Sequence, residues 1–263
     1  MWLQLGYLLF AAYSVLHLVH VVVNTGVAAL VAIAISLVTT DPRATYLVAR
    51  TWSRYNLFFT GVRVRVEGAA YIAPGQPYVA MANHQSLVDV WALIAYLPLQ
   101  LAWVMKHEIR KIPLIGFSGL RQGHIYIDRG HGAKALESLR LAGEKIRAGC
   151  SVFIFPEGTR SPDGRLIDFK TGGFALAQSA GVPILPITVN GGRQIFRKGS
   201  LKLRPGVMDI VIHPSLAVER NGERAQRKRL MAATREAIAS SLRVGREPEA
   251  ESHLASDGGL TTS

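Results

Sequence analysis

The first forty residues of the chain, from Met1 to Thr40, contain no Asp, Glu, Lys or Arg, and the first charged residue is Asp41. A helix of about 20 residues spans the apolar core of a bilayer, so this segment is too long for one straight span. The polar step Asn24-Thr25-Gly26 falls near the middle, where Asn and Gly favour an interruption of the helix. We therefore expect residues 1–40 to form a membrane anchor, built either from one span and an interfacial helix or from two helices that enter and leave the same leaflet.

Two other interpretations of this segment are weaker. A cleaved signal peptide begins with basic residues and ends at a cleavage site of small residues, whereas this chain begins with Met1-Trp2-Leu3-Gln4. A buried core helix of a soluble domain is the second alternative, and the complete lack of charge over residues 1–40 argues against it. A membrane anchor is the favoured interpretation.

The rest of the chain is strongly basic, with 30 Lys and Arg against 18 Asp and Glu and a net charge of +12. Such a balance suits nucleic acid, an anionic membrane surface or an acidic substrate. Arginines follow the anchor closely, beginning with Arg43 and Arg50, and the positive-inside rule then places the body of the protein on the cytoplasmic face of the plasma (inner) membrane. A membrane explains both the apolar segment and the charge. Nucleic acid explains only the charge, and no zinc-finger, RNP or P-loop pattern is present, so we expect an anionic membrane surface as partner and no nucleic acid.

After the anchor, short runs of β-branched, aromatic and aliphatic residues alternate with stretches of helical periodicity. The short runs predict strands at Val62–Val66, Tyr78–Ala82, Leu101–Met105, His124–Ile127, Val152–Phe155, Ile184–Val189 and Met208–Ile212. The periodic stretches predict helices at Ser86–Tyr96, Gly132–Ala148, Gly172–Ala180 and Glu223–Leu242. This alternation indicates an α/β fold with a mixed, largely parallel sheet covered by helices and preceded by the hydrophobic helical anchor. One domain is expected over residues 41–244, and the polar residues 245–263 are expected to be a disordered tail.

Polar or charged residues follow four of the predicted strands, at Asn83-His84, Lys106-His107, Asp128-Arg129 and Pro156-Glu157-Gly158-Thr159-Arg160. The carboxyl ends of parallel strands lie at one edge of a sheet, and ligands gather beyond that edge. We therefore expect these groups to converge on one rim.

His84 and Asp89 have a spacing that suits a catalytic pair. A continuous helix would turn them about 140° apart, so His84 is better placed in a loop, with Asp89 in the first turn of the following helix. From there the carboxylate reaches back to one imidazole nitrogen and leaves the other to accept a proton from a substrate hydroxyl. The alternative is purely structural, because Ser86-x-x-Asp89 also fits a capping box in which Asp89 only caps its helix.

The segment from Phe155 to Ser161 leaves an apolar strand through a turn shaped by Pro156 and Gly158. The Arg160 guanidinium and the backbone N–H groups of such a turn suit a phosphate group. A surface turn closed by a Glu157–Arg160 salt bridge explains the same residues equally well.

Taken in order, these segments resemble a known family. Asn83–Asp89, followed about 70 residues later by Phe155–Ser161, is similar to the glycerolipid acyltransferases, and most of all to the 1-acylglycerol-3-phosphate acyltransferases. Gly123–Arg129 resembles the family block that ends in a substrate-binding Arg, Phe169–Gly173 a stretch that follows the Glu-Gly-Thr-Arg turn, and Val182–Ile187 the apolar block with paired prolines. Several ordered blocks are specific where any one of them is weak.

The resemblance covers residues 78–190 and implies roles for residues that match the motifs. His84 becomes the general base and Asp89 the residue that orients it. The acceptor's phosphate site is implied at Lys106, Arg129, Glu157, Gly158, Thr159 and Arg160. The N-terminal helices of the family lie in one leaflet, which favours the re-entrant form of the anchor.

The implied reaction moves a fatty acyl group from acyl-CoA or an acyl carrier protein thioester to the sn-2 hydroxyl of 1-acyl-sn-glycerol-3-phosphate, which makes phosphatidic acid for phospholipid biosynthesis. The partners are then a lysophospholipid acceptor and an acyl thioester donor, with no metal, cofactor or covalent enzyme intermediate. Another lysophospholipid or a lyso-ornithine lipid is the alternative acceptor, because the motifs are shared across such relatives.

Other enzyme classes are disfavoured by missing patterns. A serine hydrolase needs Gly-x-Ser-x-Gly, and Gly116-Phe117-Ser118-Gly119 does not have that spacing. A metal hydrolase is weak because His124 and His131 lack a His-Glu-x-x-His arrangement. The single Cys150 forms no disulfide within the chain and is read as a small buried thiol.

Overall fold

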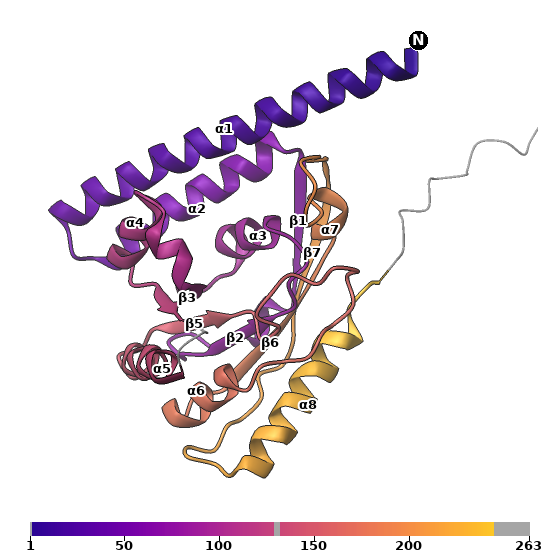
Figure 1. The fold of residues 1–263 in the computed structure, drawn as a ribbon. Helices are drawn as coiled ribbons and strands as arrows, with labels where there is room; N and C mark the ends of the chain where they lie inside the picture. Colours follow the sequence, from indigo (N-terminus) through magenta and orange to yellow (C-terminus); the bar gives the residue numbers. More distant parts are fainter. Residues whose placement is uncertain (1, 129–131, 245–263) are drawn as a thin grey trace, which may run out of the picture.

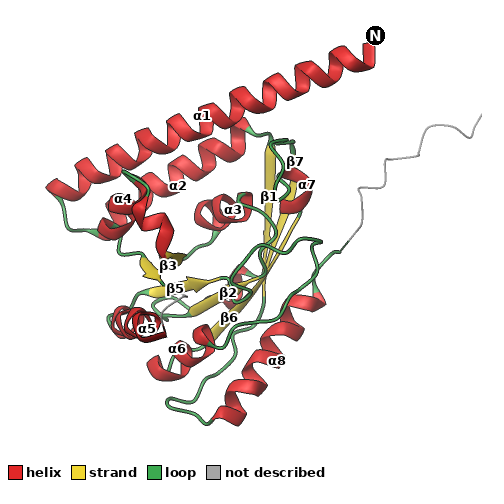
Figure 2. Cartoon of the chain, viewed as in Figure 1, coloured by secondary structure: helices red, strands yellow, loops and turns green. Residues whose placement is uncertain are grey.

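The computed structural model of the chain describes residues 2–128 and 132–244 and contains two layers of helices around one sheet (Figures 1 and 2). Arg129 and the expected tail at residues 245–263 lie outside the described residues. The sheet has seven strands in the order β1-β7-β6-β2-β5-β3-β4. The strands are β1 (Val62–Glu67), β2 (Val79–Ala82), β3 (Leu101–Lys106), β4 (Ile125–Ile127), β5 (Ser151–Ile154), β6 (Ile184–Asn190) and β7 (Gly206–Ile212).

All seven strands expected from the sequence are present, and the sheet is mixed and largely parallel as predicted. Strands β2 to β6 run in one direction, β7 is antiparallel to β6, and β1 is parallel to β7. Every residue of β2, β5 and β6 is buried. Burial on both faces explains why these strands read as continuous apolar runs rather than alternating ones.

Helices cover both faces of the sheet (Figure 1). One face carries α1 (Trp2–Val38), α2 (Pro42–Phe59), α3 (Val88–Tyr96) and α4 (Ile115–Arg121); the other carries α5 (Gly132–Arg147), α6 (Gly172–Ala180) and α8 (Arg224–Ser240). The short α7 (Gly192–Ile195) follows β6, and two 3₁₀ turns lie at Ala69–Tyr71 and His107–Lys111. The four helices expected after the anchor are therefore confirmed, whereas α2, α4 and α7 were not predicted.

The expected interruption of the N-terminal segment is wrong, because α1 continues as one helix through Asn24-Thr25-Gly26. The polar side chains there make contacts with α2 instead of breaking the helix. Asn24 Nδ2 donates to Asn56 Oδ1 at 3.1 Å, and Thr25 Oγ1 accepts from Trp52 Nε1 at 3.2 Å. The polar step is thus a packing contact between two helices.

Helix α1 leaves a long apolar surface uncovered. The stretch Ala12–Val38 is long and apolar enough to cross a membrane, with a mean hydropathy of 2.4 and only 17% of its most apolar window buried. Leu16 and Val22 are each 70% exposed. An exposed apolar surface of this length supports association of the protein with a membrane.

Candidate active site

The carboxyl ends of five parallel strands meet at one edge of the sheet, and the loop after β2 is fixed there by a side chain. Asn83 Nδ2 donates to the Val189 carbonyl at 2.8 Å, and the Val189 N–H donates to Asn83 Oδ1 at 2.7 Å. The Asn83 amide thereby continues the pairing of β2 with β6 for one more step. The next residue, His84, leaves the sheet from a defined position.

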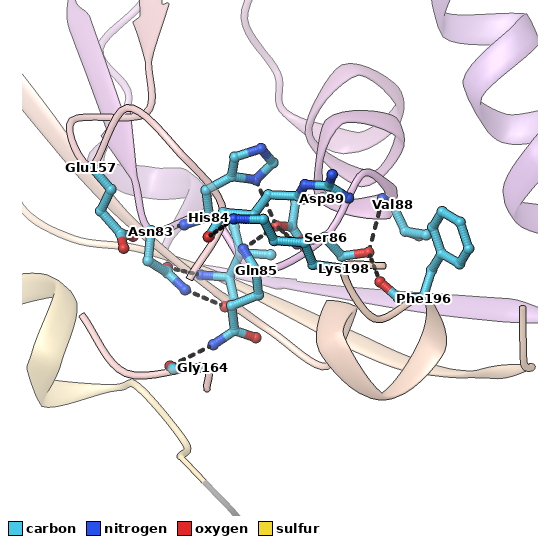
Figure 3. A network of polar contacts seen from close by, with 12 residues as sticks. Asn83, His84, Gln85, Ser86, Val88, Asp89, Glu157, Gly164, Phe196 and Lys198 are labelled. Atoms are coloured by element: carbon cyan, nitrogen blue, oxygen red, sulfur yellow. Dashed lines mark hydrogen bonds and ion pairs between the residues drawn. The ribbon is translucent and has the colours of Figure 1, made fainter. Parts of the chain in front are cut away.

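His84 and Asp89 form the pair that their spacing predicts (Figure 3). His84 Nδ1 lies 3.0 Å from Asp89 Oδ2. The Asp89 side chain is fully buried and the His84 side chain is 13% exposed. A carboxylate oxygen only accepts hydrogen bonds, so in the neutral form of the ring the proton lies on Nδ1 and Nε2 has a free lone pair. The arrangement presents a nitrogen base toward the surface.

The capping alternative for Asp89 is also correct, because the same oxygen does both tasks. Asp89 Oδ2 accepts from the backbone N–H groups of Gln85 and Ser86, each at 2.7 Å. These donors lie at the amino end of α3, where unpaired N–H groups attract a carboxylate. The cap therefore fixes the oxygen that holds His84, and the two interpretations from the sequence describe one contact.

The imidazole is also held from one face. The His84 ring stacks on the Phe155 ring with centroids 3.8 Å apart and planes 11° from parallel. Phe155 immediately follows β5 and begins the second motif. Stacking on one face and the bond at Nδ1 together restrict rotation of the base.

The turn after β5 clamps the backbone of His84 from both sides. The His84 N–H donates to Glu157 Oε1 at 2.9 Å, and the His84 carbonyl accepts from the Ser161 N–H at 2.8 Å. Two motifs that are distant in the sequence are thus joined through the backbone of one residue, which confirms that the ends of β2 and β5 converge.

Glu157 occupies a different place from the one that the sequence indicated. Its side chain is buried, with the residue 2% exposed, and its second oxygen accepts from the Ile167 N–H at 3.3 Å. The alternative of an exposed turn closed by a Glu157–Arg160 ion pair is wrong, because both carboxylate oxygens are bonded to backbone N–H groups. Glu157 acts on the site by holding His84.

Burial raises the pKa of the Glu157 carboxyl to about 7, against the lowering effect of the hydrogen bonds from His84 and Ile167. When folding raises the pKa of a carboxyl, the folded state holds its proton more tightly than the unfolded state does. The protein therefore loses stability as the pH rises from 4.5, the ordinary pKa of this group, to about 7. We expect the unfolding free energy of the wild type to fall relative to Glu157→Gln between pH 5 and 8, by at most about 3 kcal/mol. Thermal unfolding followed by tryptophan fluorescence checks this, and a wild type that gains stability over Glu157→Gln as pH rises contradicts it.

The tip of the second motif, from Gly158 to Arg160, lies nearer the surface. Gly158 has φ 74°, a left-handed conformation that glycine adopts readily and that the tight turn requires. Thr159 is exposed and Arg160 is half-buried. Lys198 Nζ donates to the Arg160 carbonyl at 3.2 Å and lies 3.4 Å from Thr159 Oγ1. Lys198 was missed from the sequence; its only signal was its place in the basic segment that follows β6.

The remaining predicted phosphate-site residues lie on β3 and after β4. Lys106 ends β3 at the same edge of the sheet and forms an exposed ion pair with Glu108, with Nζ 2.8 Å from Oε1. Arg129 follows β4 but lies outside the described residues. Lys106, Arg160 and Lys198 are therefore among the cations that the described structure brings to this edge.

The other residues considered from the sequence have structural positions. Within residues 2–128 and 132–244, no group of three or more His, Cys, Asp and Glu side chains is arranged to hold a metal ion. His124 accepts from the Trp103 N–H at 3.4 Å, and burial lowers its pKa to about 4. Burial raises the pKa of the Cys150 thiol. A basic cavity of about 550 Å³ is lined by Arg43, Arg121 and Lys145 among others, but it lies at the amino ends of β3 and β5, opposite His84.

Comparison with known proteins shows the family of the chain. An acyltransferase family model, described as "Acyltransferase", matches residues 63–190. A 1-acyl-sn-glycerol-3-phosphate acyltransferase of Pseudomonas aeruginosa is 36% identical over 189 residues, which are 70% of this chain and 72% of that protein. The chain belongs to the glycerolipid acyltransferase family. The matched region of the family contains both motifs that build the site.

Further relatives of the glycerolipid acyltransferase family are more distant or longer. A 1-acyl-sn-glycerol-3-phosphate acyltransferase of Chlamydomonas reinhardtii is 37% identical over 170 residues, 64% of this chain and 49% of that protein, so the chain spans about half its length. The crystal structure of the 1-acyl-sn-glycerophosphate acyltransferase PlsC from Thermotoga maritima has a TM-score of 0.73 and 24% identity, covering 90% of this chain and 96% of that one. This likeness supports the fold.

Proposed function

We propose that the protein transfers a fatty acyl group from an acyl thioester to the sn-2 hydroxyl of 1-acyl-sn-glycerol-3-phosphate and so makes phosphatidic acid. The observation that carries the proposal is the buried Asp89 carboxylate bonded to His84 Nδ1, which leaves Nε2 as a base beside a cationic edge of the sheet. The relatives from Pseudomonas aeruginosa and Chlamydomonas reinhardtii, named for this reaction, support the choice of substrate.

The chemistry follows from the state of His84. Its Nε2 takes the proton of the acceptor hydroxyl while that oxygen attacks the thioester carbonyl. The tetrahedral oxyanion then collapses, the C–S bond breaks, and the imidazolium returns its proton to the departing thiolate. The Asp89 carboxylate stabilises the imidazolium during this exchange. Acyl transfer of this kind is direct and needs neither a metal nor a covalent enzyme intermediate.

The acceptor's phosphate is assigned to the cationic edge formed by Lys106, Arg160 and Lys198, with Arg129 added by the resemblance. A guanidinium binds two phosphate oxygens in parallel, whereas an ammonium acts as a point charge. The half-buried Arg160 follows directly on the turn that clamps His84, so a phosphate bound there is tied to the position of the base. A soluble thioester, either acyl-CoA or acyl carrier protein, supplies the acyl group.

The membrane arrangement is part of the same proposal. The exposed apolar surface of α1 lies in one leaflet or spans the bilayer, and the net charge of +12 draws the domain toward an anionic surface. The arginines after α1 favour the cytoplasmic face of the plasma membrane. The lysophospholipid is then presented to His84 from the membrane while the thioester arrives from the cytoplasm.

The direct test follows thiol release by the protein purified in detergent, with palmitoyl-CoA and oleoyl-CoA, each with and without 1-acylglycerol-3-phosphate. Thiol release that requires the acceptor, together with phosphatidic acid as the lipid product, supports the proposal. Silence with this acceptor but turnover with an acyl carrier protein donor corrects the donor. Turnover only with another lysophospholipid or a lyso-ornithine lipid corrects the acceptor and overturns the assignment to phosphatidic acid.

Arg160→Ala is expected to raise the KM for 1-acylglycerol-3-phosphate by roughly ten- to a hundredfold, as the loss of a charged hydrogen-bonding partner predicts. The KM for the acyl donor should change by less than about threefold, because Arg160 is assigned to the phosphate of the acceptor and the thioester group of the donor is uncharged. Arg165→Ala is a matched control, since Arg165 is exposed in the following loop and pairs with Asp163. Equal losses for donor and acceptor contradict the phosphate role of Arg160.

A further inference from the structure

The second oxygen of Asp89 is unlike the first. Oδ2 accepts from three donors, whereas Oδ1 is buried and has no hydrogen-bond partner among the described residues. A buried carboxylate oxygen without a donor is unfavourable, so something other than hydrogen bonding must determine its position. The neighbour of Oδ1 is Gly192, the first residue of α7.

Gly192 has no room for a side chain. A Cβ placed on this residue would overlap Asp89 Oδ1 and would lie 3.2 Å from Asp89 Cγ and 3.0 Å from Ser86 Cβ. The backbone of α7 therefore lies directly against the carboxylate, at a distance that only glycine permits. The contact joins residues from β6–α7 and α3, which are far apart in the sequence.

The segment that carries Gly192 is itself fixed and does not simply move away. A Cβ on the preceding residue, Gly191, would overlap the Val207 carbonyl of β7, so this backbone is also closely packed from behind. At the other end of α7, the Phe196 carbonyl accepts from Ser86 Oγ at 2.7 Å, and the Phe196 N–H donates to the Gly192 carbonyl at 2.9 Å. The segment is packed between β7 and the loop that carries His84 and Asp89.

We infer that Gly192 is a positioning residue for the acyl transfer, acting through Asp89 on His84. Its bare backbone stops rotation of the carboxylate about its Cβ–Cγ bond and so keeps Oδ2 at Nδ1 of the base. This inference rests on the proposed role of His84 as general base. A methyl group at Gly192 has to turn the carboxylate or push α7 away, and turning the carboxylate breaks the 3.0 Å contact with His84. A displacement of about 1 Å at a catalytic group lowers turnover by roughly a hundredfold.

The test compares Gly192→Ala with Gly68→Ala. In both, the new methyl group overlaps an oxygen, but at Gly68 that oxygen is the Ile212 carbonyl. Gly68 follows β1, whose carboxyl end lies at the edge of the sheet opposite His84. We expect Gly192→Ala to lower kcat about a hundredfold while the KM values for donor and acceptor change by less than about twofold. Gly68→Ala should lower Tm but keep kcat per folded molecule within about threefold.

A double-mutant cycle with Asp89→Ala separates positioning from general damage. Asp89→Ala removes Oδ1, the atom that a methyl group at Gly192 meets first. In that background we expect Gly192→Ala to lower kcat and Tm much less than it does in the wild type, because its closest contact is gone and only the 3.0 Å approach to Ser86 Cβ remains. Losses that add in full to those of Asp89→Ala, or a Gly192→Ala variant with kcat within about threefold of the wild type, overturn the inference.

The Tm values measured in the double-mutant cycle do not depend on which reaction the protein catalyses. If His84→Ala retains turnover, the proposed function fails, and coupling of the two substitutions in Tm still reports whether Gly192 positions the carboxylate. If His84→Ala is inactive but the cycle shows no coupling in either kcat or Tm, the proposed function stands and the role of Gly192 is rejected.

Discussion

His84→Ala is expected to lower kcat by about 10²–10⁴-fold, the usual contribution of a positioned general base, and to leave the fold intact. The imidazole is bonded at Nδ1 to Asp89, stacked on Phe155 and 13% exposed, so its removal takes away the base but few core contacts. The backbone bonds of His84 to Glu157 and Ser161 remain available to alanine. Turnover should therefore fall far more than Tm.

His84→Asn sharpens this test, because its side-chain amide can still donate to Asp89 Oδ2 but has no basic nitrogen. It should be as inactive as His84→Ala, although its loop is better supported. His107→Ala is the matched control, since it removes an imidazole from the 3₁₀ turn after β3, where it belongs to neither motif. Thiol release by His84→Asn at more than about a tenth of the wild-type rate contradicts the assignment of His84 as base.

Glu157→Ala is expected to lower both kcat and stability. The substitution leaves the partly buried N–H groups of His84 and Ile167 without their acceptor, and each such loss destabilises the fold by at most about 1–3 kcal/mol. The base then loses one half of its backbone clamp, and a shift of about 1 Å lowers turnover by roughly a hundredfold. The KM for the acceptor should change little, because Glu157 contacts the backbone of His84 and is buried.

Steady-state kinetics of Glu157→Ala beside Glu157→Gln distinguish this role from the one implied by the family resemblance. The amide introduced by Glu157→Gln keeps one acceptor oxygen, so the kcat and Tm of this variant should lie between those of the wild type and of Glu157→Ala. A raised KM for 1-acylglycerol-3-phosphate with an unchanged kcat supports the role implied by the family resemblance instead. It places Glu157 in direct contact with the phosphate and contradicts the clamp.

Much of the fold was readable from the sequence because local patterns report burial. Strands β2, β5 and β6 are buried on both faces and read as apolar runs, and α5 and α6 begin where their periodic residues begin. Helix α2 was missed because several of its buried residues are polar. Its buried residues include Thr45, Ser53 and Asn56 beside the apolar Leu57, so polar residues interrupt the apolar stripe of the face that packs on α1 and α3.

The candidate site was likewise predictable from the sequence only in part. The proposal of His84 and Asp89 as a pair came from their spacing together with the family resemblance, and the convergence of their loop with Phe155–Arg160 came from the expected parallel strands. The inward position of Glu157, the contribution of Lys198 and the uninterrupted α1 did not, because each depends on a partner that is distant in the chain. Asn24, for example, predicted a break in the helix, whereas in the structure its side chain donates a hydrogen bond to Asn56 on α2.

The sequence by itself therefore indicated the α/β architecture and the membrane-directed apolar segment through composition and period, and it pointed to the proposed site residues through motif spacing and the family resemblance. Only the tertiary structure decided how the base is held: by Asp89 and Phe155 at the ring, by Glu157 and Ser161 at the backbone, and by Gly192 behind the carboxylate. The physical reason is that a hydrogen bond or a close backbone approach depends on positions in space, and residues from β2, α3, β5 and β6 take up those positions only when the sheet has assembled.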